Sequence, residues 1–216
     1  MLEKIKALLK GAENRETFFR RIASFFAPMD PKYKAIENAY DYAKDAFRDV
    51  ERENGDRYFE HLRAVTIILI DYLRVRDHEV IISALLHDIV EDIPSWTLER
   101  VRAEFGDRVA LLVDYLSKPS VRDYPSKKER VKVYRNRFEN APREFFFIKL
   151  SDRLHNLLTM WSFSPEKRAA KIEETTRYYL PYAEKHIILI HELEEAIEEL
   201  KRKKSKYILP KRPLGD

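Results

Sequence analysis

Three separate apolar stretches of the sequence carry imidazole or carboxylate side chains where a buried helix face is expected. His61 begins HLRAVTIILI, the pair His87 and Asp88 ends ISALLHD, and Asp152 lies within FFFIKLSDRLHNLL. Buried ionisable groups are costly unless they are paired or bind a metal. We therefore expect the three helices to converge, so that two imidazoles and two carboxylates share one ion.

The donor set limits the kind of ion. The sequence contains no cysteine, so any metal must bind histidine, carboxylate or backbone oxygen. Mixed nitrogen and oxygen donors suit Mn²⁺, Fe²⁺ or another six-coordinate divalent transition metal better than a closed structural zinc site. Four protein ligands leave about two positions for water and substrate, where a metal can polarise a phosphoryl oxygen and lower the pKa of water.

A second pair of carboxylates follows within one helical turn. Glu91 lies four residues after His87, and Asp92 lies four residues after Asp88. If the helix continues, these residues share a face, so both acids would lie beside the metal without having to bind it. That placement suits a general base that takes a proton from water, or an acid that protonates a leaving group.

Each of these features also has a simpler explanation when it is considered alone. His61 could be a hydrogen-bonded core histidine, Asp152 and Arg153 could form an internal salt bridge, and HDIVED could be an acidic helix end. The occurrence of all three in one chain favours the metal site.

Length and composition indicate a globular chain. The 216 residues are 44% hydrophobic and 36% charged, which is typical of one well-packed domain. The net charge of +4 is mixed along the chain and does not by itself indicate a nucleic-acid partner. The basic stretch KRKKSKYILPKRP is better explained as a solvated helix end than as an RNA- or membrane-binding patch. Without a membrane-spanning run or a signal peptide, we expect a cytoplasmic protein.

Helical periodicity extends over nearly the whole chain. Asp30 with Pro31, Asp77, and Ser164 with Pro165 are the N-terminal signals of three helices. The triplet Phe145–Phe147 has strand propensity, but its flanks continue the helical pattern. The sequence predicts an all-α, single-domain fold with helices over about 3–10, 15–27, 30–50, 59–74, 77–93, 97–106, 107–117, 128–141, 143–161, 164–185 and 185–203.

The pattern His61, His87-Asp88 and Asp152 resembles that of the HD superfamily of metal-dependent phosphohydrolases. The finer similarity is to the hydrolase domain of the RelA/SpoT family, which removes the 3′-pyrophosphate of the alarmones ppGpp and pppGpp. ALLHDIVED and IKLSDRLHNLLTM resemble two specific motifs of that family, while FGDRVALLVDYLSK and ETTRYYLPYAEK resemble neighbouring stretches. The similarity runs from about residue 35 to about residue 200.

The resemblance assigns roles residue by residue. It implies that Mn²⁺ is bound by His61, His87, Asp88 and Asp152, and that Glu91 and Asp92 are the catalytic acidic pair. It implies that Arg52 packs on the guanine base. An arginine there is chemically reasonable, because a guanidinium both binds phosphate and stacks on a purine. The remaining substrate-binding positions that it suggests are Asn54, Tyr58, Lys149, Arg153, Asn156 and Thr159.

Four positions depart from the family pattern. Leu62 and Arg57 stand where proline is usual, Glu53 replaces a basic residue, and Ser151 replaces alanine. Because the first three surround the base and ribose side, guanine preference is left open. The alternatives are a ppApp-type alarmone or NADPH as the substrate, or a non-catalytic nucleotide sensor built on the same fold.

The resemblance also suggests a domain organisation. Residues 1–30 would form an N-terminal helical extension, residues 31–205 the HD-type phosphohydrolase domain, and residues 206–216 a basic C-terminal tail. The chain is too short to add a nucleotidyltransferase domain, so we expect hydrolysis without synthesis. The expected partner is a small-molecule nucleotide, with no membrane and no nucleic acid, and the apolar terminal helices leave a homo-oligomer open.

Overall fold

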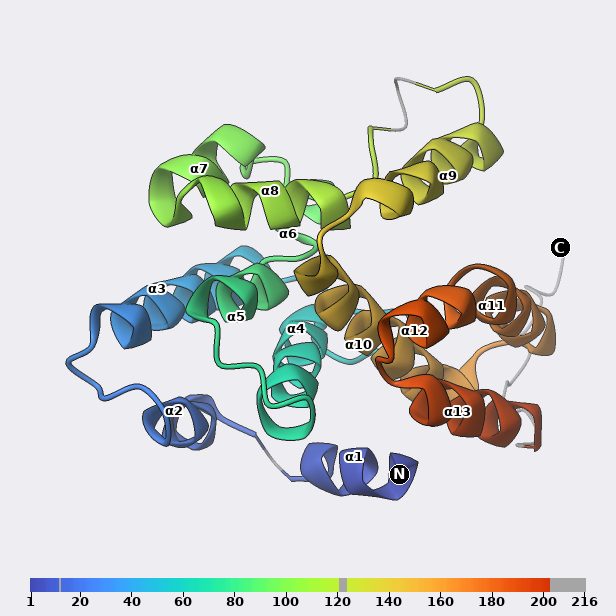
Figure 1. Ribbon diagram of the computed structural model, residues 1–216, viewed down its shortest axis with the longest axis horizontal. Helices are drawn as coiled ribbons and strands as arrows, with labels where there is room; N and C mark the ends of the chain where they lie inside the picture. The colour runs from blue at the N-terminus through green and yellow to red at the C-terminus, as the bar shows by residue number, and fades with distance from the viewer. Residues whose placement is uncertain (12, 121–123, 203–216) are drawn as a thin grey trace, which may run out of the picture.

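Helices account for the regular structure of the part of the chain that is described, which comprises residues 1–11, 13–120 and 124–202 of a computed structural model (Figure 1). In these residues extended pairing is limited to one isolated bridge between Glu51 and Arg57. The α-helices are α1 Leu2–Leu9, α2 Arg15–Ala23, α3 Pro31–Ala46, α4 Tyr58–Ile67, α5 His78–Leu85, α6 Ile89–Asp92, α7 Leu98–Phe105, α8 Asp107–Leu116, α9 Lys127–Asn136, α10 Arg143–Thr159, α11 Pro165–Tyr178, α12 Leu180–His186 and α13 Ile190–Arg202.

The N-terminal signals that the sequence offered are confirmed. The Asp30 side chain accepts a hydrogen bond from the backbone of Lys32. Asp77 accepts from two backbone amides at the start of α5, and Ser164 accepts from the third residue of α11. Such caps satisfy amides that have no partner within the helix. The prediction of helix for Phe145–Phe147 is also confirmed, because α10 includes this triplet.

The predicted helix over 77–93 is wrong as one continuous element. α5 ends at Leu85, a turn follows, and the short helix α6 begins at Ile89. The predicted helix over 164–185 is likewise two helices. Pro181 lies in the first turn of α12, and proline lacks the amide that a helix needs, so α11 ends at Tyr178. Periodicity did not detect either break, because the apolar spacing continues across both.

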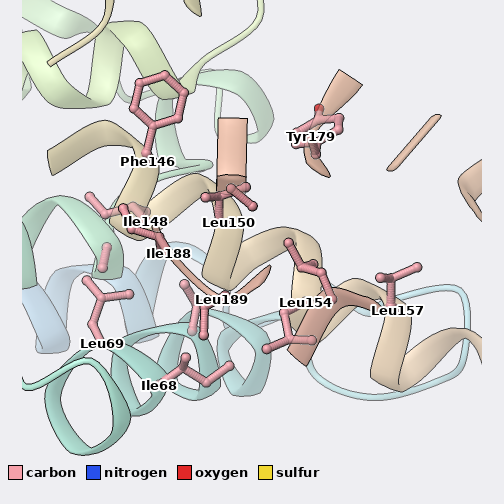
Figure 2. Close-up of a cluster of buried hydrophobic side chains, with 14 of the residues drawn as sticks. Ile68, Leu69, Phe146, Ile148, Leu150, Leu154, Leu157, Tyr179, Ile188 and Leu189 are labelled. Atoms are coloured by element: carbon pink, nitrogen blue, oxygen red, sulfur yellow. The ribbon is translucent and has the colours of Figure 1, made fainter. Parts of the chain in front are cut away.

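The long helix α10 is the centre of the fold. It packs against α4, α5 and α8 and against α11, α12 and α13, and Figure 1 shows it crossing the middle of the molecule between these two groups. Figure 2 shows Leu150 and Leu154 of α10 in one apolar cluster with Ile68 and Leu189. A second cluster joins α2, α3 and α7. Helices α4, α5 and α8 contribute to both clusters, which makes the fold a single domain.

Residues 1–30, expected as an extension, bury apolar side chains against the rest of the chain. Leu2 and Ile5 of α1 belong to the α10 cluster, while Phe18 and Ile22 of α2 belong to the α3 cluster. Full burial of each such side chain contributes about 1.5–3 kcal/mol. The boundary at residue 30 stays a prediction, and the predicted basic tail at 206–216 lies outside the described residues.

None of the helices formed by the described residues combines the length and the hydropathy needed to cross a membrane.

Candidate metal centre

Four of the predicted site residues meet at one point, from α4, from the turn after α5 and from α10. His61 Nε2 lies 3.3 Å from Asp152 Oδ1 and 4.0 Å from Asp88 Oδ2. His87 Nε2 lies 3.1 Å from Asp88 Oδ2 and 4.0 Å from Asp152 Oδ1. One ligand atom from each of His61, His87 and Asp88 can be chosen so that all lie within 4.8 Å of one another.

The break after α5 explains how two consecutive residues reach the same point. Neighbouring residues of a continuous α-helix point about 100° apart. The chain instead turns at Leu86, and Asp88 becomes the N-cap of α6 with φ −109° and ψ 1°. The Asp92 amide still donates to the Asp88 carbonyl, so Asp92 keeps the one-turn spacing from Asp88 that the sequence predicted.

The hydrogen bonds of His87 leave one ring nitrogen available for a cation. His87 Nδ1 lies 2.8 Å from the carbonyl oxygen of Ala84, and because a carbonyl only accepts, this nitrogen carries the proton. In the neutral ring His87 Nε2 then presents a lone pair, although the Asp88 carboxylate outweighs burial and raises the pKa of this imidazole. This nitrogen is buried and makes no hydrogen bond within the described part of the chain, although Asp88 Oδ2 is near. A buried lone pair that faces carboxylate oxygens fits a metal ion between them.

The second imidazole is oriented by a histidine that the sequence analysis did not assign. His61 Nδ1 lies 2.8 Å from Nδ1 of His155, so one of the two nitrogens donates and the other accepts. Burial lowers the pKa of His61 and holds the pKa of His155 well below its ordinary value, so burial favours the neutral form of both rings. Its spacing in the sequence could have indicated His155, because this residue lies three residues after Asp152 on the same helix face.

Both carboxylates are held by further polar groups. Tyr58 Oη donates to Asp88 Oδ2 at 2.7 Å. Lys149 Nζ donates to Asp152 Oδ2 at 3.1 Å, and Asn156 Nδ2 donates to Asp152 Oδ1. Burial alone would raise the pKa of Asp152, but the Lys149 ammonium and the nearby imidazoles outweigh it and hold that pKa well below its ordinary value.

The acidic pair after the turn has two different environments. Both oxygens of Glu91 lie 3.0 Å from Lys118 Nζ, and Arg130 also donates to Glu91. Asp92 has no such clamp among the described residues. Burial and then the charge of Asp88 raise the pKa of Asp92 to about 6. The sequence analysis assigned no role to Lys118 or Arg130.

Arg52 reaches the site from the turn before α4. Gly55 has a φ of +86°, a left-handed conformation that favours glycine, and the Arg52 amide donates to the Asp56 carbonyl across this turn. The Arg52 guanidinium donates to Asn156 Oδ1 at 2.6 Å and to Thr159 Oγ1 at 2.9 Å. The structure does not bring Asn54 to the cluster, because its amide bonds with Asp56 inside the turn.

A cavity of about 200 Å³ is lined by three residues of the cluster, which are His61, Asp88 and Asp152. Its wall includes Arg153, which donates to Glu174 at 2.8 Å and lies 3.7 Å above the centre of the Tyr179 ring. Lys171 also contacts Glu174. Burial opposes ionisation of Glu174, but these two cations outweigh it and lower its pKa to about 2. The cavity therefore combines carboxylates with several fixed cations, as a site for a phosphorylated ligand requires.

Comparison with known proteins places the chain in a family. The family model of the HD domain matches residues 39–188, which is more than half of the chain. The chain belongs to the HD-domain family. Its single-domain, all-α fold is the fold that the resemblance implied.

Curated relatives of this HD-domain protein are named for alarmone metabolism. A protein of Aquifex aeolicus named guanosine-3′,5′-bis(diphosphate) 3′-pyrophosphohydrolase is 38% identical over 151 residues, which are 68% of this chain and 21% of the relative. The Escherichia coli bifunctional (p)ppGpp synthase/hydrolase SpoT is 35% identical over 178 residues, which are 81% of this chain and 24% of the relative. The chain thus spans about a quarter or less of these relatives.

A solved structure supports the fold. The structure titled as a metazoan ortholog of SpoT that hydrolyzes ppGpp matches 76% of this chain and 94% of its own length, with a TM-score of 0.62. At 24% sequence identity, the match shows that the two proteins share the HD-domain fold.

Proposed function

We propose that this HD-domain chain removes the 3′-pyrophosphate of ppGpp and pppGpp with the help of Mn²⁺, which yields GDP or GTP and pyrophosphate. The observation that carries the proposal is the convergence of His61, His87, Asp88 and Asp152 beneath a cavity that also holds Glu91, Asp92 and cations. Relatives named for this reaction support the substrate class.

The four converging residues would hold the metal. Two imidazole nitrogens and two carboxylates, with no sulfur, suit Mn²⁺ or another divalent transition metal. When bound, such an ion polarises a phosphoryl oxygen and lowers the pKa of water. Tyr58, Lys149 and Asn156 fix the directions of the two carboxylates, and the Ala84 carbonyl fixes the protonated nitrogen of His87.

The two acids divide the proton chemistry between them. With a pKa near 6, Asp92 can exchange a proton close to neutral pH, which suits a group that takes a proton from water or gives one to the 3′ oxygen as it leaves. Glu91 is held by Lys118 and Arg130. As a fixed carboxylate it would orient the attacking water.

Cations in the wall would bind the phosphates. Lys149, Arg153 and Lys171 line the cavity, although each also contacts a carboxylate. Donors fixed before the substrate arrives stabilise negative charge that develops on phosphoryl oxygens. The cavity, at about 200 Å³, is smaller than the roughly 300–1,000 Å³ usual for whole ligands, so it suits the pyrophosphate end of the nucleotide.

The nucleoside would extend along the end of α10. Arg52 bridges Asn156 and Thr159 there, and its guanidinium could stack on a purine. Thr159 lines a separate cavity of about 530 Å³. Glu53, which stands where the family has a basic residue, pairs with the ammonium of Lys167, so a cation still lies at this edge.

The decisive experiment measures pyrophosphate release from ppGpp and pppGpp with Mn²⁺, with chelator as the blank. We expect release by the wild type and loss of release in Asp152→Asn. A matched control is Asp114→Asn, which removes one carboxylate outside the catalytic cavity and should keep activity. Pyrophosphate release from none of the tested 3′-pyrophosphorylated nucleotides would refute the proposal.

The same assay separates the alternatives. ppApp and NADPH in place of ppGpp test the base and the phosphate position, and faster turnover of either would replace the guanine assignment. A non-catalytic sensor would bind nucleotide without turnover, and Glu91→Gln would then change nothing that the assay measures.

A further inference from the structure

A second cavity, of about 560 Å³, lies between α9 and the α11–α12 segment. Figure 1 shows α9 above α11 and α12. We call this cavity the basic groove. Its wall carries five cations and one carboxylate: Lys128, Lys132, Arg135, Arg177, Lys185 and Glu139. None of its lining residues also lines the catalytic cavity.

The positive charge of the groove is not balanced by nearby acids. Lys132, Arg177 and Lys185 have no described carboxylate within ion-pair distance, and Glu139 accepts a hydrogen bond from Tyr182 at 2.9 Å. Elsewhere arginines are commonly paired; Arg108, for instance, contacts three carboxylates. Since the whole chain carries a net charge of only +4, this concentration of cations, of which Arg135 alone has a described carboxylate partner, favours an external anion.

Arg135 gives the groove a fixed donor. Its guanidinium lies 3.7 Å from the centre of the Tyr178 ring, and that of Arg177 lies 5.3 Å from the same ring. The Arg135 Nε atom is buried and makes no hydrogen bond with the described residues. Stacking on the Tyr178 ring restricts the orientation of this guanidinium, which lowers the entropic cost of a contact with phosphate.

Arg135 also connects the groove to the catalytic cavity. Its Nη2 donates to Glu174 Oε1 at 2.6 Å, while Arg153 and Lys171 of the catalytic cavity contact Glu174 Oε2. An anion that engages Arg135 would weaken its bond to Glu174. Glu174 would then neutralise Arg153 and Lys171 more completely.

We propose that the basic groove binds a polyphosphate group, which is either the di- or triphosphate of a nucleotide or a free inorganic polyphosphate. Several closely spaced phosphates match several closely spaced cations, and the volume admits a ligand of this size. The chemistry requires only phosphate oxygens and no reaction at the groove.

The test is a calorimetric titration of the full chain with inorganic tripolyphosphate, in chelator and without turnover. We expect saturable binding that weakens about tenfold or more in the double variant Lys132→Ala/Arg177→Ala, because two charge-assisted contacts are lost. The matched control is Lys4→Ala/Lys44→Ala, which removes the same charge from exposed positions on α1 and α3 and should change the affinity less than twofold.

Three results would overturn the proposal: no saturable binding, an unchanged affinity in the groove variant, or an equal loss in the control variant. Because this titration needs no hydrolysis, its outcome is independent of whether the proposed reaction occurs. Titration with GTP and ATP identifies the source. Nucleotide binding tighter than tripolyphosphate indicates a nucleotide ligand, and equal binding indicates that the phosphates alone are recognised.

A second readout, which rests on the proposed function, concerns the link through Arg135. At fixed free Mn²⁺, tripolyphosphate should raise the KM for ppGpp more in the wild type than in Lys132→Ala/Arg177→Ala, while basal turnover is the same in both. An equal rise in both proteins would show that tripolyphosphate acts only at the catalytic cavity, and would remove the link.

Discussion

Lys149→Met tests the electrostatics of the candidate metal centre directly. Lys149 and Asp152 are buried, with 4% and 7% of their surface exposed, and their side chains are 3.1 Å apart. Burial alone would lower the pKa of Lys149, but Tyr134 and Asp152 outweigh it and hold that pKa well above its ordinary value. Methionine keeps a similar volume and removes the charge, so Asp152 loses its ammonium partner without a large cavity.

The size of the effect follows from the burial. Removing one partner of a buried ion pair costs about 3–5 kcal/mol, which at a urea m-value of about 2 kcal/mol/M lowers the unfolding midpoint by about 1.5–2.5 M. This loss of stability is expected when a chelator keeps the protein free of metal. Bound Mn²⁺ would supply positive charge to Asp152 in place of the ammonium, and a ligand at a hundredfold excess over its Kd stabilises by about 2.7 kcal/mol. Removal of the ammonium should tighten Mn²⁺ binding, and each tenfold gain in affinity shrinks the loss by about 1.4 kcal/mol when Mn²⁺ is present in excess.

The assay is urea unfolding of wild type and Lys149→Met, each with chelator and with Mn²⁺. Lys44→Met serves as the control, since Lys44 is exposed and should change stability by less than about 0.5 kcal/mol. If Mn²⁺ stabilises wild type and Lys149→Met by the same amount, Asp152 does not share a site with the ion, and the reasoning fails.

Three further outcomes are expected. Glu91→Gln should lower kcat about a hundredfold or more with Mn²⁺ content unchanged, as kinetics and metal analysis would show; undiminished turnover would contradict its role. Arg52→Ala should raise KM at least about tenfold with little change in kcat, and a loss confined to kcat would contradict substrate binding. The pKa of Asp92 is raised to about 6, so its carboxylate form is lost as the pH falls through that value. We therefore expect kcat/KM to fall about tenfold per pH unit below pH 6, and we expect this slope to vanish in Asp92→Asn.

Much of the fold could be predicted because local rules and tertiary packing agree. The caps at Asp30, Asp77 and Ser164 each precede an amphipathic run and each bonds to the helix that follows. The breaks at Leu86 and Tyr179 were not predictable from periodicity. At the first break the His87 ring bonds to the Ala84 carbonyl, and apolar spacing carries no information about such a contact.

The core of the candidate site could be predicted because the sequence shows ionisable residues at positions where burying them costs free energy. His61, the His87-Asp88 pair and Asp152 interrupt apolar helices, and a shared ion explains all three interruptions. The partners of Glu91 could not be predicted, since Lys118 and Arg130 resemble ordinary surface cations until the chain folds them onto that carboxylate. Long-range pairs between charged residues leave no periodic trace in a single sequence.

Anomalous diffraction from crystals grown with Mn²⁺ tests the central claim most directly. A single anomalous peak between His61, His87, Asp88 and Asp152, with all four side chains within about 2.0–2.4 Å of it, is the predicted result. A peak elsewhere, or no peak while those four side chains keep the contacts described here, would contradict it.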